Sequence, residues 1–200
     1  VVVSQLFGAK RIHEMKSTIS TAIISLSVLG LIIMGLGTVF AGPLLHLLGT
    51  DPDIMADSEL YLQIYFGGAV FLFLYNTLNG IYNAQGDSKT PLIFLIISSL
   101  TNIVLDLLFV IQFDMRVAGV AWATLIAQGM CAVASLIVMY RRMKRLPCEE
   151  GRENEKVPLF HMTAVRRIAQ IGLPSMLQQS LVSLSMMMMQ GLVNSYGKVL

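Results

Sequence analysis

Five long apolar runs constrain what this chain can fold into more than any other feature of its sequence. Four of the runs contain no Asp, Glu, Lys or Arg, and the other contains one acid. They cover residues 17–49, 60–86, 90–113, 117–140 and 168–197. About 20 apolar residues are enough for a helix to cross a hydrocarbon core of about 30 Å, so every run is long enough to span a membrane.

The low proportion of charged residues supports the same interpretation. Charged residues make up 13% of the chain and its mean hydropathy is +0.70, whereas soluble domains carry roughly twice that share of charge. The sequence therefore predicts an all-α integral membrane protein, a bundle of spanning helices joined by short polar loops.

Basic residues occur in alternate loops, which predicts how the chain is oriented. Nearly all Lys and Arg residues lie in the loops at 8–16, 85–91 and 141–167, whereas the loops at 51–59 and 114–116 hold only Arg116. Cytoplasmic loops of membrane proteins are enriched in Lys and Arg. We therefore expect the first three loops to be cytoplasmic and the other two to lie on the opposite side.

Asp106 is the acid inside the apolar run at 90–113. A carboxylate in the middle of a membrane helix costs about 2.5–3.5 kcal/mol on insertion scales, which makes it a candidate functional residue. Asn102 lies four positions earlier, hence on the same helix face. Thr124 lies seven residues into the next run, and Asp106 lies seven before Phe113, so an antiparallel hairpin would place the two at a similar depth.

Asn102, Asp106 and Thr124 thus predict a cluster of oxygen ligands, which suits Na⁺ or a proton carried by the carboxylate. The alternative for Asp106 is a buried acid held only by hydrogen bonds between helices. For Thr124 alone, ordinary helix packing is the simpler explanation.

Two further groups of side chains are candidates for a substrate cavity. Asn76, Asn79 and Asn83 recur at spacings of three and four residues and therefore form one polar stripe. In the last run, the candidates are Gln178, Met187 and Gln190, and Met187 is one of four consecutive methionines whose thioethers could adapt to varied apolar ligands. The alternatives are hydrogen bonds between helices for the amides and contact with lipid for the methionines.

The energy source is predicted from the motifs that the sequence lacks. The chain has neither a Gly-x-x-x-x-Gly-Lys phosphate loop nor a dinucleotide-binding glycine pattern. We therefore expect no enzymatic activity and no cofactor other than a coupling ion, which would be Na⁺ or H⁺.

Seven short motifs in order resemble the multidrug and toxic compound extrusion (MATE) family. They are SQLFGAK at 4–10, LLGT at 47–50, LYNTLNG at 74–80, QGDSKTP at 85–91, NIVLD at 102–106, VAGVAWAT at 117–124 and IGLPS at 171–175. The resemblance implies a twelve-helix transporter of two lobes, of which this chain covers late helix 2 to helix 7. Residues 1–140 would belong to the amino-terminal lobe, 141–167 to a cytoplasmic linker between the lobes, and 168–200 to the first helix of the carboxy-terminal lobe.

The resemblance also implies a site and an activity. The cation site of the family uses an acid on its first helix, which this chain does not include, and an Asn, an Asp and a Thr that match Asn102, Asp106 and Thr124. Many relatives carry Pro where this chain has Leu107, so the resemblance does not decide whether the helix bends at that position, although the three ligands are kept.

The expected function is cation-coupled export of amphiphilic, often cationic, drugs or toxic compounds by alternating access, in the plasma membrane. The expected partners are these small molecules and membrane lipids, with no nucleic acid, and the protein is expected to act as a monomer. The alternatives are a related flippase for lipid-linked sugars and a scaffold that transports nothing. No Lys or Arg falls within the five runs, which argues against a cavity built for a polyanionic lipid.

Overall fold

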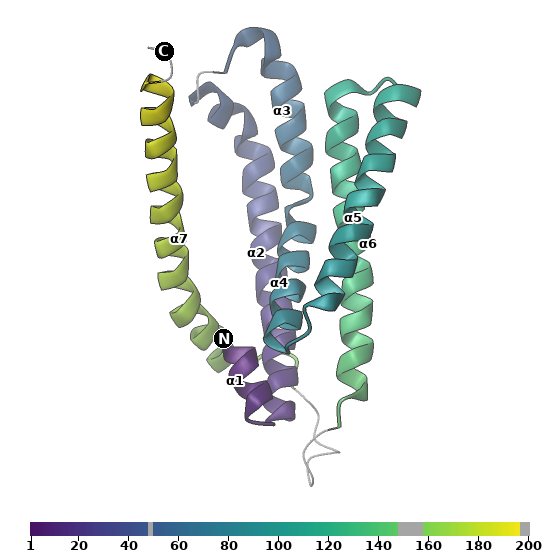
Figure 1. Cartoon of the computed structure of the whole chain (residues 1–200), viewed down its shortest axis with the longest axis vertical. Coiled ribbons are helices and arrows are strands. Elements are labelled where there is room, and N and C mark those ends of the chain that lie inside the picture. Colours follow the sequence, from purple (N-terminus) through teal and green to yellow (C-terminus); the bar gives the residue numbers. More distant parts are fainter. Residues whose placement is uncertain (48–49, 148–157, 197–200) are drawn as a thin grey trace. The chain divides into compact units, whose positions relative to one another are not determined.

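The computed structural model describes residues 1–47, 50–147 and 158–196, with residues 191–196 described by their backbone alone. Every regular element in this part of the chain is helical, which confirms the predicted all-α class (Figure 1). The elements are α1 (Val2–Gly8), α2 (Ile12–Leu47), α3 (Pro52–Gly67), α4 (Ala69–Ala84), α5 (Lys89–Leu107), the π-helical turn η1 (Leu108–Gln112), α6 (Arg116–Arg145) and α7 (Met162–Tyr196).

The chain divides into two compact units, Val1–Phe160 and His161–Leu200. The first unit contains α1 to α6, and the second contains α7. The boundary falls within the predicted linker at 141–167, of which residues 148–157 lie outside the described part of the chain. The assignment of these segments to two lobes stays a prediction.

Most of the apolar runs coincide with helices that can cross a membrane. By length and composition, α2, the continuous segment of α5 and η1, and α6 qualify, and the bent pair α3–α4 makes a fourth span. The helix α7 is as long as predicted but is not among these candidates in the residues described, since Gln170, Gln178, Gln179 and Gln190 lower its hydropathy. Its role as a fifth span therefore stays a prediction.

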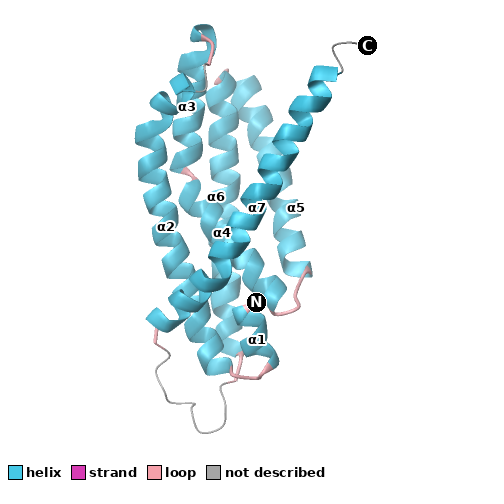
Figure 2. Cartoon of the chain, turned by 90° about the vertical axis from the view of Figure 1, so that its left-hand side faces the viewer, coloured by secondary structure: helices cyan, strands magenta, loops and turns pink. Residues whose placement is uncertain are grey.

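The second apolar run differs from the expected single straight helix. The acidic segment before it, which we expected to be the loop at 51–59, forms the beginning of the 16-residue α3. Pro52 occupies the first turn, where a missing N–H costs nothing, and the Asp51 carboxylate accepts a hydrogen bond from the Asp53 N–H at 3.1 Å. The span then bends by 47° at Gly68, the short break between α3 and α4 (Figure 2).

Glycines on α2 allow a close approach to the bent span. A Cβ on Gly30 would lie 2.9 Å from the Val70 Cα, and a Cβ on Gly37 would lie 2.2 Å from the Phe66 ring. Helices in lipid associate through such small residues, because hydrocarbon outside is as apolar as the protein interior. Gly30 and Gly37 therefore determine how closely α2 lies against α3 and α4.

A hydrophobic core joins four helices at the end of the unit that carries the basic loops. Its buried side chains come from α1, α2, α4 and α6, and they are Val3, Leu6, Met15, Ile19, Leu78, Ile81, Tyr82 and Met139. The Tyr82 hydroxyl donates a hydrogen bond to the Ser135 carbonyl oxygen at 3.0 Å, which ties α4 to α6.

An ion pair ties the turn between α4 and α5 to the end of α6. The Asp87 carboxylate accepts hydrogen bonds from the Thr90 N–H at 3.1 Å and the Thr90 hydroxyl at 2.8 Å, and it pairs with the Arg142 guanidinium. The two hydrogen bonds from Thr90, together with Arg142, lower the pKa of the Asp87 carboxyl to about 2. These contacts fix the turn at 85–91 against the end of α6.

Gly30→Ala should destabilise the protein, because its new methyl group would meet the Val70 backbone rather than a movable side chain. Overpacking of this kind costs about 1–3 kcal/mol. Gly35→Ala is the matched control, since a Cβ there meets no atom within 4 Å. It should leave stability unchanged or raise it by up to about 1 kcal/mol through helix propensity. Thermal unfolding in detergent measures both, and equal behaviour of the two variants would contradict the close approach.

Asp87→Asn should lower thermal stability at neutral pH, because it removes the charge that Thr90 and Arg142 stabilise. A carboxyl group whose pKa is lowered on folding contributes stability above its unfolded pKa of about 3.9, and the contribution is lost as the pH falls through the folded value. The difference in melting temperature between the parent and Asp87→Asn should therefore shrink below about pH 4 and vanish near about pH 2. Asp57→Asn, at an exposed position on α3, should match the parent throughout.

Candidate functional site

The hairpin of α5 and α6 brings Asn102 and Thr124 together. The Asn102 side-chain amide donates to the Thr124 hydroxyl oxygen at 3.4 Å, although the two residues are 22 positions apart. The Thr124 hydroxyl in turn donates to the Val120 carbonyl at 2.9 Å. These two bonds leave the side-chain carbonyl oxygen of Asn102 free to accept a hydrogen bond or to bind a cation. Because the Thr124 proton is directed to Val120, the Thr124 oxygen acts as an acceptor.

Asp106 lies one turn after Asn102 on α5, near the same face, and is partly buried. Its Oδ1 atom is enclosed by protein and has no hydrogen-bond partner among the described residues. Of the three predicted ligands, Asn102 and Thr124 are thus bonded to each other, whereas this oxygen of Asp106 is bonded to neither. An enclosed carboxylate oxygen without a donor is costly, and that cost would fall if it took up a proton or a cation.

The π-helical turn η1 begins two residues after Asp106. Its wider hydrogen bonding is shown by the Phe113 N–H, which donates to the Leu108 carbonyl five residues earlier at 3.3 Å. A Cβ on Gly119 would lie 3.1 Å from the Phe109 Cβ, so η1 packs closely against α6. The structure thus places a helical irregularity beside Asp106 although the chain has Leu107 rather than Pro.

The three asparagines of α4 have different surroundings. Asn76 is exposed, its side-chain amide donates to the Leu72 carbonyl at 2.9 Å, and it lines a hollow of about 380 Å³. Asn79 is partly buried, and its Oδ1 has no hydrogen-bond partner in the described part of the chain. Asn83 is exposed and is not among the residues that line the hollow.

The hollow is formed mainly by apolar side chains from α2 and α4. The residues that line it are Leu26, Leu72, Phe73, Asn76 and Thr77. Among these residues only Asn76 was predicted from the sequence, because the residue types of Leu26 and Phe73 do not distinguish them from other apolar residues of a membrane helix. Tyr75 was also missed: its hydroxyl is buried without a hydrogen-bond partner in the residues described, and its spacing of four from Asn79 could have indicated it.

The remaining candidates lie in the second unit. Gln178, Met187 and Gln190 are on α7, and all three side chains are exposed. Their place in a cavity stays a prediction. The described residues also contain no group of three or more His, Cys, Asp and Glu that could hold a metal, so a cation at Asp106 would need amide and hydroxyl oxygens.

Similarity to curated proteins extends over nearly the whole chain. It is 34% identical to the "Probable multidrug resistance protein YpnP" of Bacillus subtilis, over 98% of this chain and 42% of that protein. It is 26% identical to the "Multidrug export protein MepA" of Staphylococcus aureus, again over 98% of this chain and 42% of that protein. The chain thus spans about two fifths of the length of these relatives.

Solved structures show the same fold. A Vibrio cholerae MATE transporter, VcmN in its bent form, matches with a TM-score of 0.80 and 23% identity over 98% of this chain and 43% of that one. An inward-facing multidrug resistance MATE family transporter matches with a TM-score of 0.71 and 22% identity over 86% of this chain and 38% of that one.

The MatE family model matches residues 1–108, which include α1 to α5 and Asp106. This match covers more than half of the chain, and it agrees with the ordered motifs and the helical membrane fold. The chain therefore belongs to the MatE family, a family of membrane transporters and not of enzymes.

Proposed function

We propose that the protein to which this chain belongs is a multidrug efflux transporter driven by Na⁺ or H⁺ through Asp106. The observation that carries the proposal is the enclosed Asp106 Oδ1 without a hydrogen-bond donor, one turn from the bonded Asn102–Thr124 pair. The names of the curated relatives YpnP and MepA support drug export as the activity.

The chemistry of the site supports a hard cation or a proton. The Asn102 carbonyl, the Asp106 carboxylate and the Thr124 hydroxyl offer oxygen atoms only, which are the ligands that hard cations prefer. Coupling requires that the ion bind the two transport states with different affinity. The π-helical turn beside Asp106 supports such a difference, because irregular helical turns of this kind occur often at functional sites.

The hollow between α2 and α4 supports an amphiphilic substrate. Leu26, Leu72 and Phe73 offer it an apolar lining, and Asn76 and Thr77 offer hydrogen bonds. No Lys or Arg lines the hollow, which argues against the flippase for polyanionic lipids. We propose that Asn76 contacts substrate and that Asn79, Asn83, Gln178, Met187 and Gln190 face the pathway at other stages.

The distribution of charge supports a cytoplasmic location for one end of the first unit. Lys16 donates a hydrogen bond to the Leu146 carbonyl at 2.8 Å, and Arg142 pairs with Asp87, so three of the basic loops meet at one end. In the protein, this end would lie on the cytoplasmic side of the plasma membrane, with the loops at 8–16, 85–91 and 141–167.

Asp106→Asn should abolish efflux, because an amide can neither release a proton nor offer a cation a full negative charge. Asp114→Asn is the matched control: it makes the same chemical change in the exposed turn after η1 and should transport normally. The measurement is dye efflux from vesicles that hold the full-length protein, with Na⁺ and pH gradients imposed separately. The gradient that drives efflux in the parent identifies the coupling ion.

Size-exclusion chromatography of both variants shows whether either has lost its fold. Normal efflux by well-folded Asp106→Asn would overturn the proposed role of Asp106 and leave a scaffold or an acid held for structural reasons as the explanation.

Asn76→Ala should raise the KM for dye efflux several-fold, about 1 kcal/mol for one lost hydrogen bond to substrate, with a smaller effect on kcat. Gln5→Ala removes an exposed amide from α1, which does not line the hollow, and should leave the KM unchanged. Equal effects of the two substitutions would show that the hollow is not where substrate binds.

A further inference from the structure

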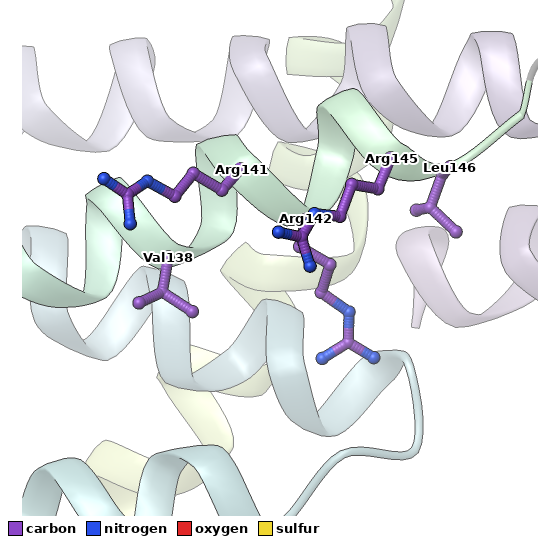
Figure 3. Close-up of a pocket in the computed structure, with 5 residues that line it drawn as sticks. All are labelled: Val138, Arg141, Arg142, Arg145 and Leu146. Atoms are coloured by element: carbon purple, nitrogen blue, oxygen red, sulfur yellow. The ribbon is translucent and has the colours of Figure 1, made fainter.

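The last turns of α6 carry a basic pocket that shares no residue with the proposed ion site or with the hollow between α2 and α4. The pocket has a volume of about 320 Å³ and is lined by Val138, Arg141, Arg142, Arg145 and Leu146 (Figure 3). Its residues recur at spacings of three and four positions, so they share one face of the helix. Figure 3 shows Val138 and Leu146 at opposite ends of the pocket, with the side chains of Arg142 and Arg145 between them and the Arg141 guanidinium pointing away from those two.

The charge of this pocket is only partly compensated within the described residues. Arg142 pairs with Asp87 and lies with its guanidinium carbon 5.9 Å from the centre of the Tyr82 ring. Arg141 and Arg145 are exposed and form neither an ion pair nor a hydrogen bond there. Arg141 and Arg145 lie about one helical turn apart in the sequence and are therefore both available to an anion, and arginine binds the oxygens of phosphate in a bidentate manner.

The position of the pocket indicates where such an anion would come from. The uncharged run of α6 ends at Tyr140, which is exposed. The Lys144 ammonium lies over the Tyr140 ring, 5.6 Å from the ring centre. Tyrosine is enriched at the membrane–water interface, so the arginines that follow it lie at the level of lipid headgroups. Val138 lies about one helical turn before Arg141 and Arg142 and therefore deeper in the membrane, where it would contact the upper part of an acyl chain.

We propose that this pocket, which we call the α6 arginine pocket, binds the phosphate of an anionic phospholipid. Arg141 and Arg145 hold the phosphate, Val138 and Leu146 contact the adjoining glycerol and acyl carbons, and Arg142 stays with Asp87. The Lys16 ammonium, which donates to the Leu146 carbonyl, offsets the negative end of the helix that would otherwise repel a phosphate. This site does not depend on the coupling role of Asp106.

The test compares lipid binding to the full-length protein and to charge-matched variants. Native mass spectrometry would count bound phosphatidylglycerol against phosphatidylcholine, and a thermal-shift titration with the same lipids would give affinities. Arg141→Gln/Arg145→Gln should weaken phosphatidylglycerol binding about tenfold, since it removes both guanidinium groups that would hold the phosphate. Lys10→Gln/Lys89→Gln removes two charges from turns at the same end and should change the affinity less than about twofold.

A second variant keeps every arginine. Val138→Glu places a carboxylate on the apolar side of the pocket, at a residue that is 41% exposed, and should also weaken phosphatidylglycerol binding while efflux and thermal stability remain. This variant distinguishes loss of the lipid site from loss of the fold.

Three results would overturn the proposal. Equal losses in the two double variants would show only diffuse attraction by surface charge. Equal binding of phosphatidylglycerol and phosphatidylcholine would show that the arginines select no anionic lipid. If inorganic phosphate raised the melting temperature as much as phosphatidylglycerol does, the pocket would be a site for free phosphate instead.

Discussion

Backbone hydrogen bonding without water is the constraint on which the rest of this structure depends. In hydrocarbon, each N–H and C=O must find its partner within the protein, so a spanning helix can break only where the freed groups are bonded again. At the bend between α3 and α4, the Gly68 N–H donates to the carbonyls of Ile64 and Tyr65, and its own carbonyl accepts from Phe71 and Leu72. At η1, the Phe113 N–H reaches the Leu108 carbonyl. Both irregularities therefore keep their polar groups bonded.

The second irregularity explains the surroundings of the intramembrane acid. A π-helical turn places one extra residue in the helix, so side chains after Leu107 point in directions that a continuous α-helix would not give them. Phe109 consequently meets Gly119, and the Met115 N–H donates to the Phe109 carbonyl at 3.0 Å. These contacts hold α5 against α6 just beyond Asp106.

Sequence reasoning succeeded where a single periodicity or length decided the outcome. The lengths of the apolar runs predicted α2, α5 and α6. Equal distances from a shared turn predicted that Thr124 lies at the depth of Asp106, whereas the Thr124 hydroxyl is hydrogen-bonded to Asn102 instead. The bend at Gly68 was not predicted, because the run at 60–86 is uniformly apolar on both sides of it. Likewise, residues 108–112 have the composition of any membrane helix, so nothing in their types indicated η1.

Contacts between distant residues were the least accessible from sequence. Asp87 and Arg142 are 55 positions apart, and no spacing rule joins a turn to the end of a later helix. The missing hydrogen bond at Asp106 could not be predicted either, since it depends on the side-chain torsions of three residues on two helices. Helix type and depth were predictable here because they follow from local pattern, whereas partner choice follows from tertiary packing.

The distribution of buried side chains bears on how a change at Asp106 could alter the fold. Met15, Ile19, Leu78, Tyr82 and Met139 are almost completely buried at the basic end, where they join α2, α4 and α6. By contrast, α3 has no buried residue and α5 has only Phe94. Segments with few buried contacts have the lowest free energy of local displacement. In the proposed mechanism, a change of charge at Asp106 would therefore act on a helix that is held mainly by α6, while the packed basic end would provide a fixed base for it.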